Sequence, residues 1–162
     1  MRISISVSKP TIDDVVVLHS AQRYITWVAL ENCMEYFGSV QCIGSNTEPI
    51  IPQGQHLLVF RRFLNAIESL NNIPDYIFHE ENPGNICLDD FRSKMIEGNT
   101  VIRKVSEIAN AYKHRIRGSG KKKPFQPKTE LLSAKEIKYD HATIYEAFKY
   151  WSEYDPKKKN AF

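Results

Sequence analysis

Hydrophobic residues recur at helical spacing along most of this chain, and prolines, glycines and capping residues divide the pattern into separate helices. The first predicted helix begins at Thr11 and runs to about Phe37. Apolar residues lie almost all round it, which is typical of a central helix in a bundle. Its polar exceptions, His19, Arg23 and Thr26, fall on one side, and we interpret His19 as half-exposed rather than catalytic.

A second helix is predicted after a loop over 39–53, which contains prolines and a glycine. It begins near Gln55 and keeps an i, i+3, i+4, i+7 apolar pattern. Because Pro74 cannot donate to the helical hydrogen-bond ladder, we expect the helix to break or kink at 72–73. Residues 75–81 then add further turns.

Three shorter segments complete this part of the pattern. Residues 82–85 form a predicted turn, and 88–96 form a short helix. Residues 118–130 are small, basic and interrupted by proline, so they are predicted to be a loop. Asp140 is a predicted N-cap for a last helix that runs to about Tyr154.

The clearest predicted helix covers residues 99–118. Asn99 and Thr100 can accept the free N–H groups of a first turn, and Gly118 can close the last turn. One face of this helix is apolar, with Val101, Val105, Ile108, Tyr112 and Ile116. The opposite face carries Arg103, Glu107, Asn110, His114 and Arg117, which we call the polar stripe.

Four main helices with short extra helices and almost no strand signal predict an all-α, up-and-down bundle. We expect a single domain over 1–155 and a basic tail over 156–162. The predicted core includes Ile25, Val28, Phe63, Ile67, Ile108, Tyr112, Phe148 and Trp151.

Charge is distributed unevenly between the two parts of the chain. Residues 1–98 contain 7 Lys and Arg against 12 Asp and Glu, a net charge of −5, whereas residues 99–162 contain 15 against 7, a net charge of +8. Such asymmetry is typical of a basic part with an anionic partner, and equally of two solvated faces that attract each other.

Composition favours a globular protein of the cytoplasm. Apolar residues make up 42% of the 162 residues, and no apolar run reaches the length of a membrane span, so no membrane association is expected. The three cysteines, Cys33, Cys42 and Cys87, form no CxxC pair, and we interpret them as reduced thiols.

Most sequence signatures of catalysis are missing. The chain has no phosphate-binding glycine loop, no HExxH and no Glu-x-x-His pair, so no cofactor and no metal site is expected. His79, Glu80 and Glu81, with Asp75 one turn earlier, are interpreted as a solvated acidic helix end. A metal-dependent bundle enzyme is therefore disfavoured.

The segment from Asn110 to His114, NAYKH, lies late in a long helix and resembles the HEPN superfamily of small all-α proteins. It is also similar to the corresponding helix of uncharacterised bacterial helical proteins. The HEPN motif has an Arg, commonly a polar residue such as Asn, three further residues and a His. Asn110 and His114 match the last positions, and Ala109 occupies the Arg position. The resemblance implies a homodimer in a bacterial toxin–antitoxin or anti-phage setting, and either a metal-independent ribonuclease or an inactive helical module.

Chemistry assigns roles to the residues of the polar stripe if RNA is cleaved by its own 2′-hydroxyl. His114 can move protons because imidazole titrates near neutral pH, and Asn110 can orient its ring. Arg117 can stabilise the phosphorane. Arg103 is about 16 Å from His114 along the axis, so it would meet His114 only across a two-fold dimer. Further candidate binding residues are Glu107, Lys113, Arg115, Lys121, Lys122 and Lys123.

Two functions remain open from the sequence. The first is an RNA-cleaving enzyme, dimeric through the polar stripe. The second is a catalytically inactive module of the same fold that binds a protein, such as an antitoxin, or a nucleotide.

Overall fold

The computed structural model describes residues 20–40, 49–81, 84–117 and 140–155, excluding the side chains of 113–117. Within these ranges every regular element is a helix and no strand is present, so the predicted all-α class is confirmed. The elements are α2 (Ala21–Tyr24), η2 (Ile25–Ala29), α3 (Leu30–Ser39), α4 (His56–Glu81), α5 (Leu88–Gly98), α6 (Thr100–Arg117) and α7 (His141–Ser152). The predicted loop over 118–130, the basic tail, His19 and Cys42 lie outside the described residues.

Elements α2, η2 and α3 form one continuous helix with a π-helical turn in its middle. The N–H of Leu30 donates to the carbonyl of Ile25, five residues earlier. A π turn holds more residues than an α turn, so it keeps Ile25, Ala29 and Cys33, spaced by four, on the buried side. Apolar residues were expected almost all round this helix, which is typical of a central position. The helix is instead covered on one side, because Trp27 and Met34 are exposed on its outer side.

Helix α4 runs unbroken through Pro74, so of the break or kink predicted at 72–73 the break does not occur. Two features explain this difference. Ile73, Pro74 and Ile77 are all buried, so packing favours the continuous helix. A guanidinium N–H of Arg92, from α5, donates to the carbonyl of Asn71 in the turn before the proline. That donor helps to satisfy the backbone where proline disturbs the ladder.

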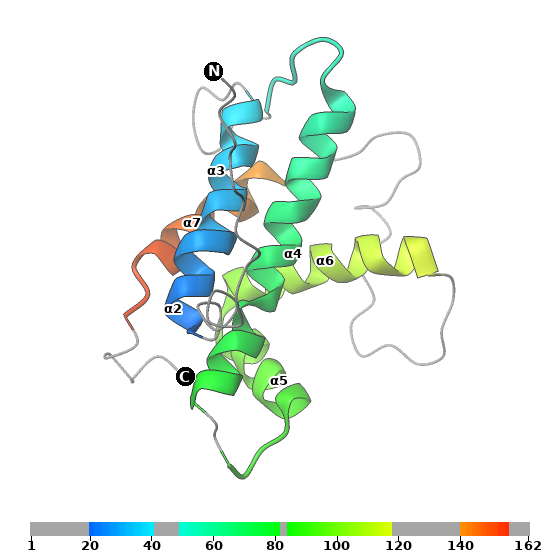
Figure 1. The fold of residues 1–162 in the computed structure, drawn as a ribbon. Coiled ribbons are helices and arrows are strands. Elements are labelled where there is room, and N and C mark those ends of the chain that lie inside the picture. The colour runs from blue at the N-terminus through cyan, green and yellow to red at the C-terminus, as the bar shows by residue number, and fades with distance from the viewer. Residues whose placement is uncertain (1–19, 41–48, 82–83, 118–139, 156–162) are drawn as a thin grey trace, which may run out of the picture.

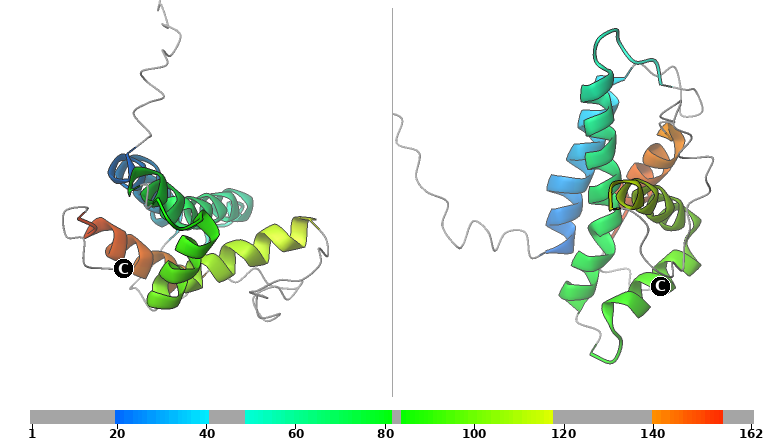
Figure 2. Two further views of the ribbon diagram at one scale, coloured as in Figure 1. Left: turned by 90° about the horizontal axis from the view of Figure 1, so that it is seen from below. Right: turned by 90° about the vertical axis from the view of Figure 1, so that its right-hand side faces the viewer.

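The described helices pack around one hydrophobic core. Figure 1 shows the continuous helix α2–η2–α3 lying antiparallel to α4, while α6 runs across α4 at a steep angle, and Figure 2 shows the same crossing from two other sides. Helix α6 also packs against α5 and α7. Five predicted core residues are buried, and Val28, Tyr112 and Phe148 are half-buried against them. The five are Ile25, Phe63, Ile67, Ile108 and Trp151.

The predicted N-caps at Asn99 and Asp140 are confirmed. The side-chain oxygen of Asn99 accepts the N–H groups of Val101 and Ile102, at 2.9 and 3.1 Å. Asp140 accepts the N–H of Thr143 at 2.9 Å. These contacts satisfy donors that the first turn of a helix leaves without an intrahelical partner. They define where α6 and α7 begin.

In the described part of the chain, no helix combines the length and the apolar character that crossing a membrane requires.

Candidate functional site

The structure describes the first part of the polar stripe on α6. Arg103, Glu107 and Asn110 are half-buried, so this side of the helix is partly covered rather than fully exposed. Helix α6 continues to Arg117, but the side chains of Lys113, His114, Arg115 and Arg117 are not among those described, and Lys121, Lys122 and Lys123 lie outside the described ranges. The geometry proposed for His114 therefore stays a prediction.

Arg103 contacts the carboxyl end of the neighbouring helix. Its Nε donates to the carbonyl of Ile96, and one terminal nitrogen donates to the carbonyl of Glu97, both at 3.3 Å. These carbonyls belong to the last turn of α5, where the chain lacks further helical donors. Arg103 is therefore engaged within its own chain and supports the joint between α5 and α6.

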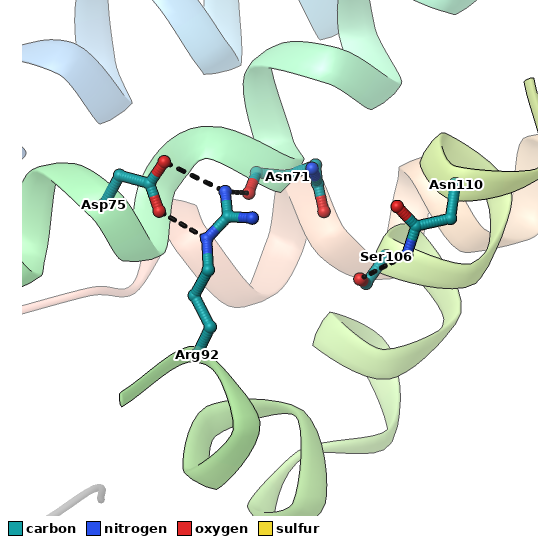
Figure 3. A network of polar contacts seen from close by, with 5 residues as sticks. All are labelled: Asn71, Asp75, Arg92, Ser106 and Asn110. Atoms are coloured by element: carbon teal, nitrogen blue, oxygen red, sulfur yellow. Dashed lines mark hydrogen bonds and ion pairs between the residues drawn. The ribbon is translucent and has the colours of Figure 1, made fainter. Parts of the chain in front are cut away.

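Asn110 lies one turn before His114 and makes a local contact of its own. Its side-chain amide donates to the hydroxyl oxygen of Ser106 at 3.5 Å, which is a long bond (Figure 3). A bond this long constrains the side chain weakly. Asn110 is thus available to a partner that approaches this side of α6.

Ala109 occupies the position at which the HEPN motif has its Arg. Its side chain is 2% exposed and belongs to the hydrophobic core. A guanidinium is too large and too polar for such a position, because a buried charge needs a partner and several hydrogen bonds. The structure therefore offers no cation at this point of the motif and leaves no room for one.

A polar cluster that the sequence did not predict joins α4 and α5 beside α6. Arg92 of α5 makes a two-pronged ion pair with Asp75 of α4, in which the contact between a terminal nitrogen and Oδ2 is 2.9 Å. Figure 3 shows the side chain of the buried Asn71 between this ion pair and the Ser106–Asn110 contact. The guanidinium uses its donors on Asp75 and on the Asn71 carbonyl, so the cluster fixes the packing of two helices. In the sequence, the only indication of this cluster is the i, i+4 spacing of Asn71 and Asp75.

The acidic end of α4 has a structural role too. Oε2 of Glu80 accepts the N–H of Ala21 at 2.8 Å, so it caps the first turn of α2. Asp75 is paired with Arg92. Among the described residues, no group of three His, Cys, Asp or Glu side chains is arranged to hold a metal ion.

The pKa shifts among the described groups have burial as their main cause. Burial raises the pKa of Tyr24 and of Cys33 to about 12, and it does the same for Tyr154, beside Glu81 and Glu80. Burial lowers the pKa of His141, against the opposing effect of Asp140. These shifts follow from desolvation of the charged form and do not identify a catalytic group.

Comparison with protein families, with curated proteins and with solved structures finds no match for this chain.

Proposed function

We propose that this protein is a HEPN-like helical module that binds RNA through the carboxyl-terminal half of α6 and the basic residues that follow it in sequence, and does not cleave it. The burial of Ala109 is the observation that carries this proposal. A metal-independent ribonuclease needs a cation beside its proton-transfer group, because charge develops on the phosphorane. The motif position that would provide this cation points into the core instead.

Arg103 does not replace the missing cation. Both of its described contacts are to carbonyls of α5, and moving it toward a substrate would leave those carbonyls without their donor. This removes the residue that a dimer with opposed polar stripes would bring to His114. Of the three positions considered for this cation, residue 109 has no charge and Arg103 is engaged, which leaves Arg117 alone; we therefore favour binding without cleavage over catalysis.

Charge and position favour RNA as the ligand. Residues 99–162 contain 15 Lys and Arg against 7 Asp and Glu, and six of these basic residues are concentrated between Lys113 and Lys123. Figure 1 shows the carboxyl-terminal end of α6 extending beyond α4, away from the other helices. Basic side chains on such an extension can neutralise several phosphates of one strand. A bacterial toxin–antitoxin or anti-phage system, with an antitoxin as protein partner, is the setting that the resemblance implies.

The test is a binding and cleavage assay with a labelled single-stranded RNA. Fluorescence anisotropy at several salt concentrations measures the affinity, and a denaturing gel of the same samples measures cleavage. We expect binding that weakens steeply as salt rises, and intact RNA throughout. Combined replacement of Lys121, Lys122 and Lys123 by Ala should weaken binding at least tenfold. The matched control, Lys149→Ala on the exposed side of α7, should change it little.

Two results would overturn the proposal. Absence of RNA binding at low salt would remove RNA as the ligand. Cleavage that His114→Ala abolishes, with the melting temperature unchanged, would show that the protein is a ribonuclease after all.

A further inference from the structure

The outer side of the continuous helix α2–η2–α3 exposes apolar residues that the bundle does not use. Trp27 is 57% exposed and Met34 is 53% exposed, although both residue types are usually covered in a folded domain. They are seven residues apart in one continuous helix, and both occupy exposed positions on its outer side. Charged residues border them: Arg23 one turn before Trp27, and Glu31 and Glu35 after it. We call Arg23, Trp27, Glu31, Met34 and Glu35 the outer stripe.

The π turn contributes to the exposure of Trp27. Residues 25–29 form this turn, and it keeps Ile25 and Ala29 buried while Trp27 lies on the outside. The guanidinium carbon of Arg23 is 5.8 Å from the centre of the Trp27 ring, which is within cation–π distance. A π turn interrupts the regular hydrogen bonding of an α-helix, and such turns are often found at functional sites. The exposed tryptophan is thus a consequence of the local backbone geometry.

We propose that the outer stripe is an interface between two copies of this chain, packed as antiparallel helices about a two-fold axis near Leu30 and Glu31. Trp27 and Met34 are equally spaced about this axis, so each Trp27 meets Met34 of the second copy. Sulfur–aromatic contacts of this kind are favourable. A two-fold interface requires such self-complementarity, because the same surface is used by both copies.

The order of charges along the stripe points to the same arrangement. The positive Arg23 lies at the amino-terminal end, and the negative Glu35 lies at the carboxyl-terminal end. Antiparallel packing brings each Arg23 within one turn of Glu35 of the second copy, which gives two equivalent ion pairs. Glu35 is 61% exposed, and its pair with Arg62 within the chain is 4.0 Å long, so it remains accessible. A parallel pair would place like charges opposite each other.

The interface is of the small, reversible kind. Two tryptophans and two methionines that are each roughly half-exposed provide only a part of the 1,200 Å² or so that stable interfaces bury in total. The two Glu31 carboxylates near the axis oppose association as well. We therefore expect a dimer that forms at micromolar concentrations and dissociates on dilution.

Sedimentation velocity on the full chain over a range of concentrations tests the proposal. Wild type should shift from monomer to dimer, and Trp27→Ala should weaken the dimer at least tenfold. Arg23→Glu alone and Glu35→Arg alone should each weaken it as well, since each places like charges against each other. An equal mixture of these two variants should recover the dimer, because in the heterodimer one ion pair has its original residues and the other is restored with reversed sign.

Two measurements complete the design. Native mass spectrometry of the mixture should show the mass of the heterodimer, and circular dichroism should show that each variant keeps its helices. Glu107→Lys, on the polar stripe of α6, is the matched control and should leave the dimer intact.

The proposal is overturned by a wild type that stays monomeric up to several hundred micromolar, which would assign the outer stripe to another partner. It is overturned equally by a mixture that dimerises no better than either variant, or by a dimer that Glu107→Lys disrupts and Trp27→Ala does not. Because Arg23, Trp27 and Glu35 do not belong to α6, the dimer and RNA binding can succeed or fail independently.

Discussion

Burial determines the chemistry of the titratable side chains in the core. Cys33 is completely buried, and burial raises its pKa to about 12. The Tyr24 hydroxyl donates to the carbonyl of Ser69 at 3.1 Å, and burial raises its pKa to about 12 as well. For His141 burial lowers the pKa, so the neutral imidazole is favoured. In all three cases the fold favours the uncharged form, as expected where water is excluded.

Cys33 gives the first prediction at this scale. At pH 8, iodoacetamide should modify the exposed Cys87 within minutes and leave Cys33 unmodified until the chain unfolds, because the thiolate is the reactive form. Peptide mass spectrometry with and without urea measures both sites. Rapid alkylation of Cys33 in the folded protein would show that this part of the core opens readily.

The same pKa predicts a loss of stability in alkali. The ordinary pKa of the thiol is 9.0, and the folded value is about 12. Between these values the unfolded chain releases the proton and the folded chain keeps it, so stability present below pH 9 decreases as pH rises toward 12. Cys33→Ala should reduce this decrease in urea titrations at pH 9 and above.

At the scale of elements, the joint between α4 and α5 depends on a few polar contacts. Arg92 donates to both oxygens of Asp75 and to the carbonyl of Asn71, just before Pro74. The ion pair is about one-third exposed on each side, so solvent screens it in part. The ion pair contributes mainly through its geometry. The forked guanidinium of Arg92 positions α5 against α4 and supports the backbone beside Pro74.

Arg92→Lys tests this joint while keeping the charge. Lysine cannot make the two-pronged contact and reach the Asn71 carbonyl at once, so the free energy of unfolding should decrease by about 1–2 kcal/mol. Urea denaturation followed by circular dichroism measures the change. The control is Lys94→Arg, on the exposed side of the same helix, which should leave the free energy of unfolding almost unchanged. An Arg92→Lys protein as stable as wild type would mean that the contact contributes nothing to the joint.

Local signals in the sequence predicted the elements well. The helix expected over 99–118 is Thr100–Arg117, because Asn99 caps it through contacts with residues next to it. The continuation through Pro74 was not predictable, since it depends on packing and on Arg92 from another helix. The exposure of Trp27 was missed because a π turn shifts the helical period by one residue. The burial of Ala109 depends on which side of α6 the other helices cover, and spacing alone does not give that.

For the whole molecule, two surfaces are separated by the packed core. Helix α6 contacts α4, α5 and α7, and its amino-terminal part is therefore built into the bundle. Its carboxyl-terminal part extends outward and leads into the most basic part of the sequence. The outer stripe belongs to the helix α2–η2–α3. In the part of the chain that the structure describes, this helix and α6 share the core but do not contact each other directly. This separation allows one surface for RNA and another for a second copy.

The central claim, that the motif-like segment is not catalytic, depends on Ala109 pointing into the core. Ala109→Arg tests it most directly, because it restores the Arg of the motif at the position where a nuclease would have it. If the position is buried as the structure has it, the larger and charged side chain should lower the free energy of unfolding by about 3 kcal/mol or more. Asn110→Arg, at the adjacent half-buried position, is the control and should cost much less.

The measurement is urea denaturation of wild type, Ala109→Arg and Asn110→Arg, with RNA cleavage assayed on the same samples. We predict a strongly destabilised Ala109→Arg protein that does not cleave RNA. An Ala109→Arg protein as stable as wild type that gains RNA cleavage would contradict the account, because residue 109 would then face an active site.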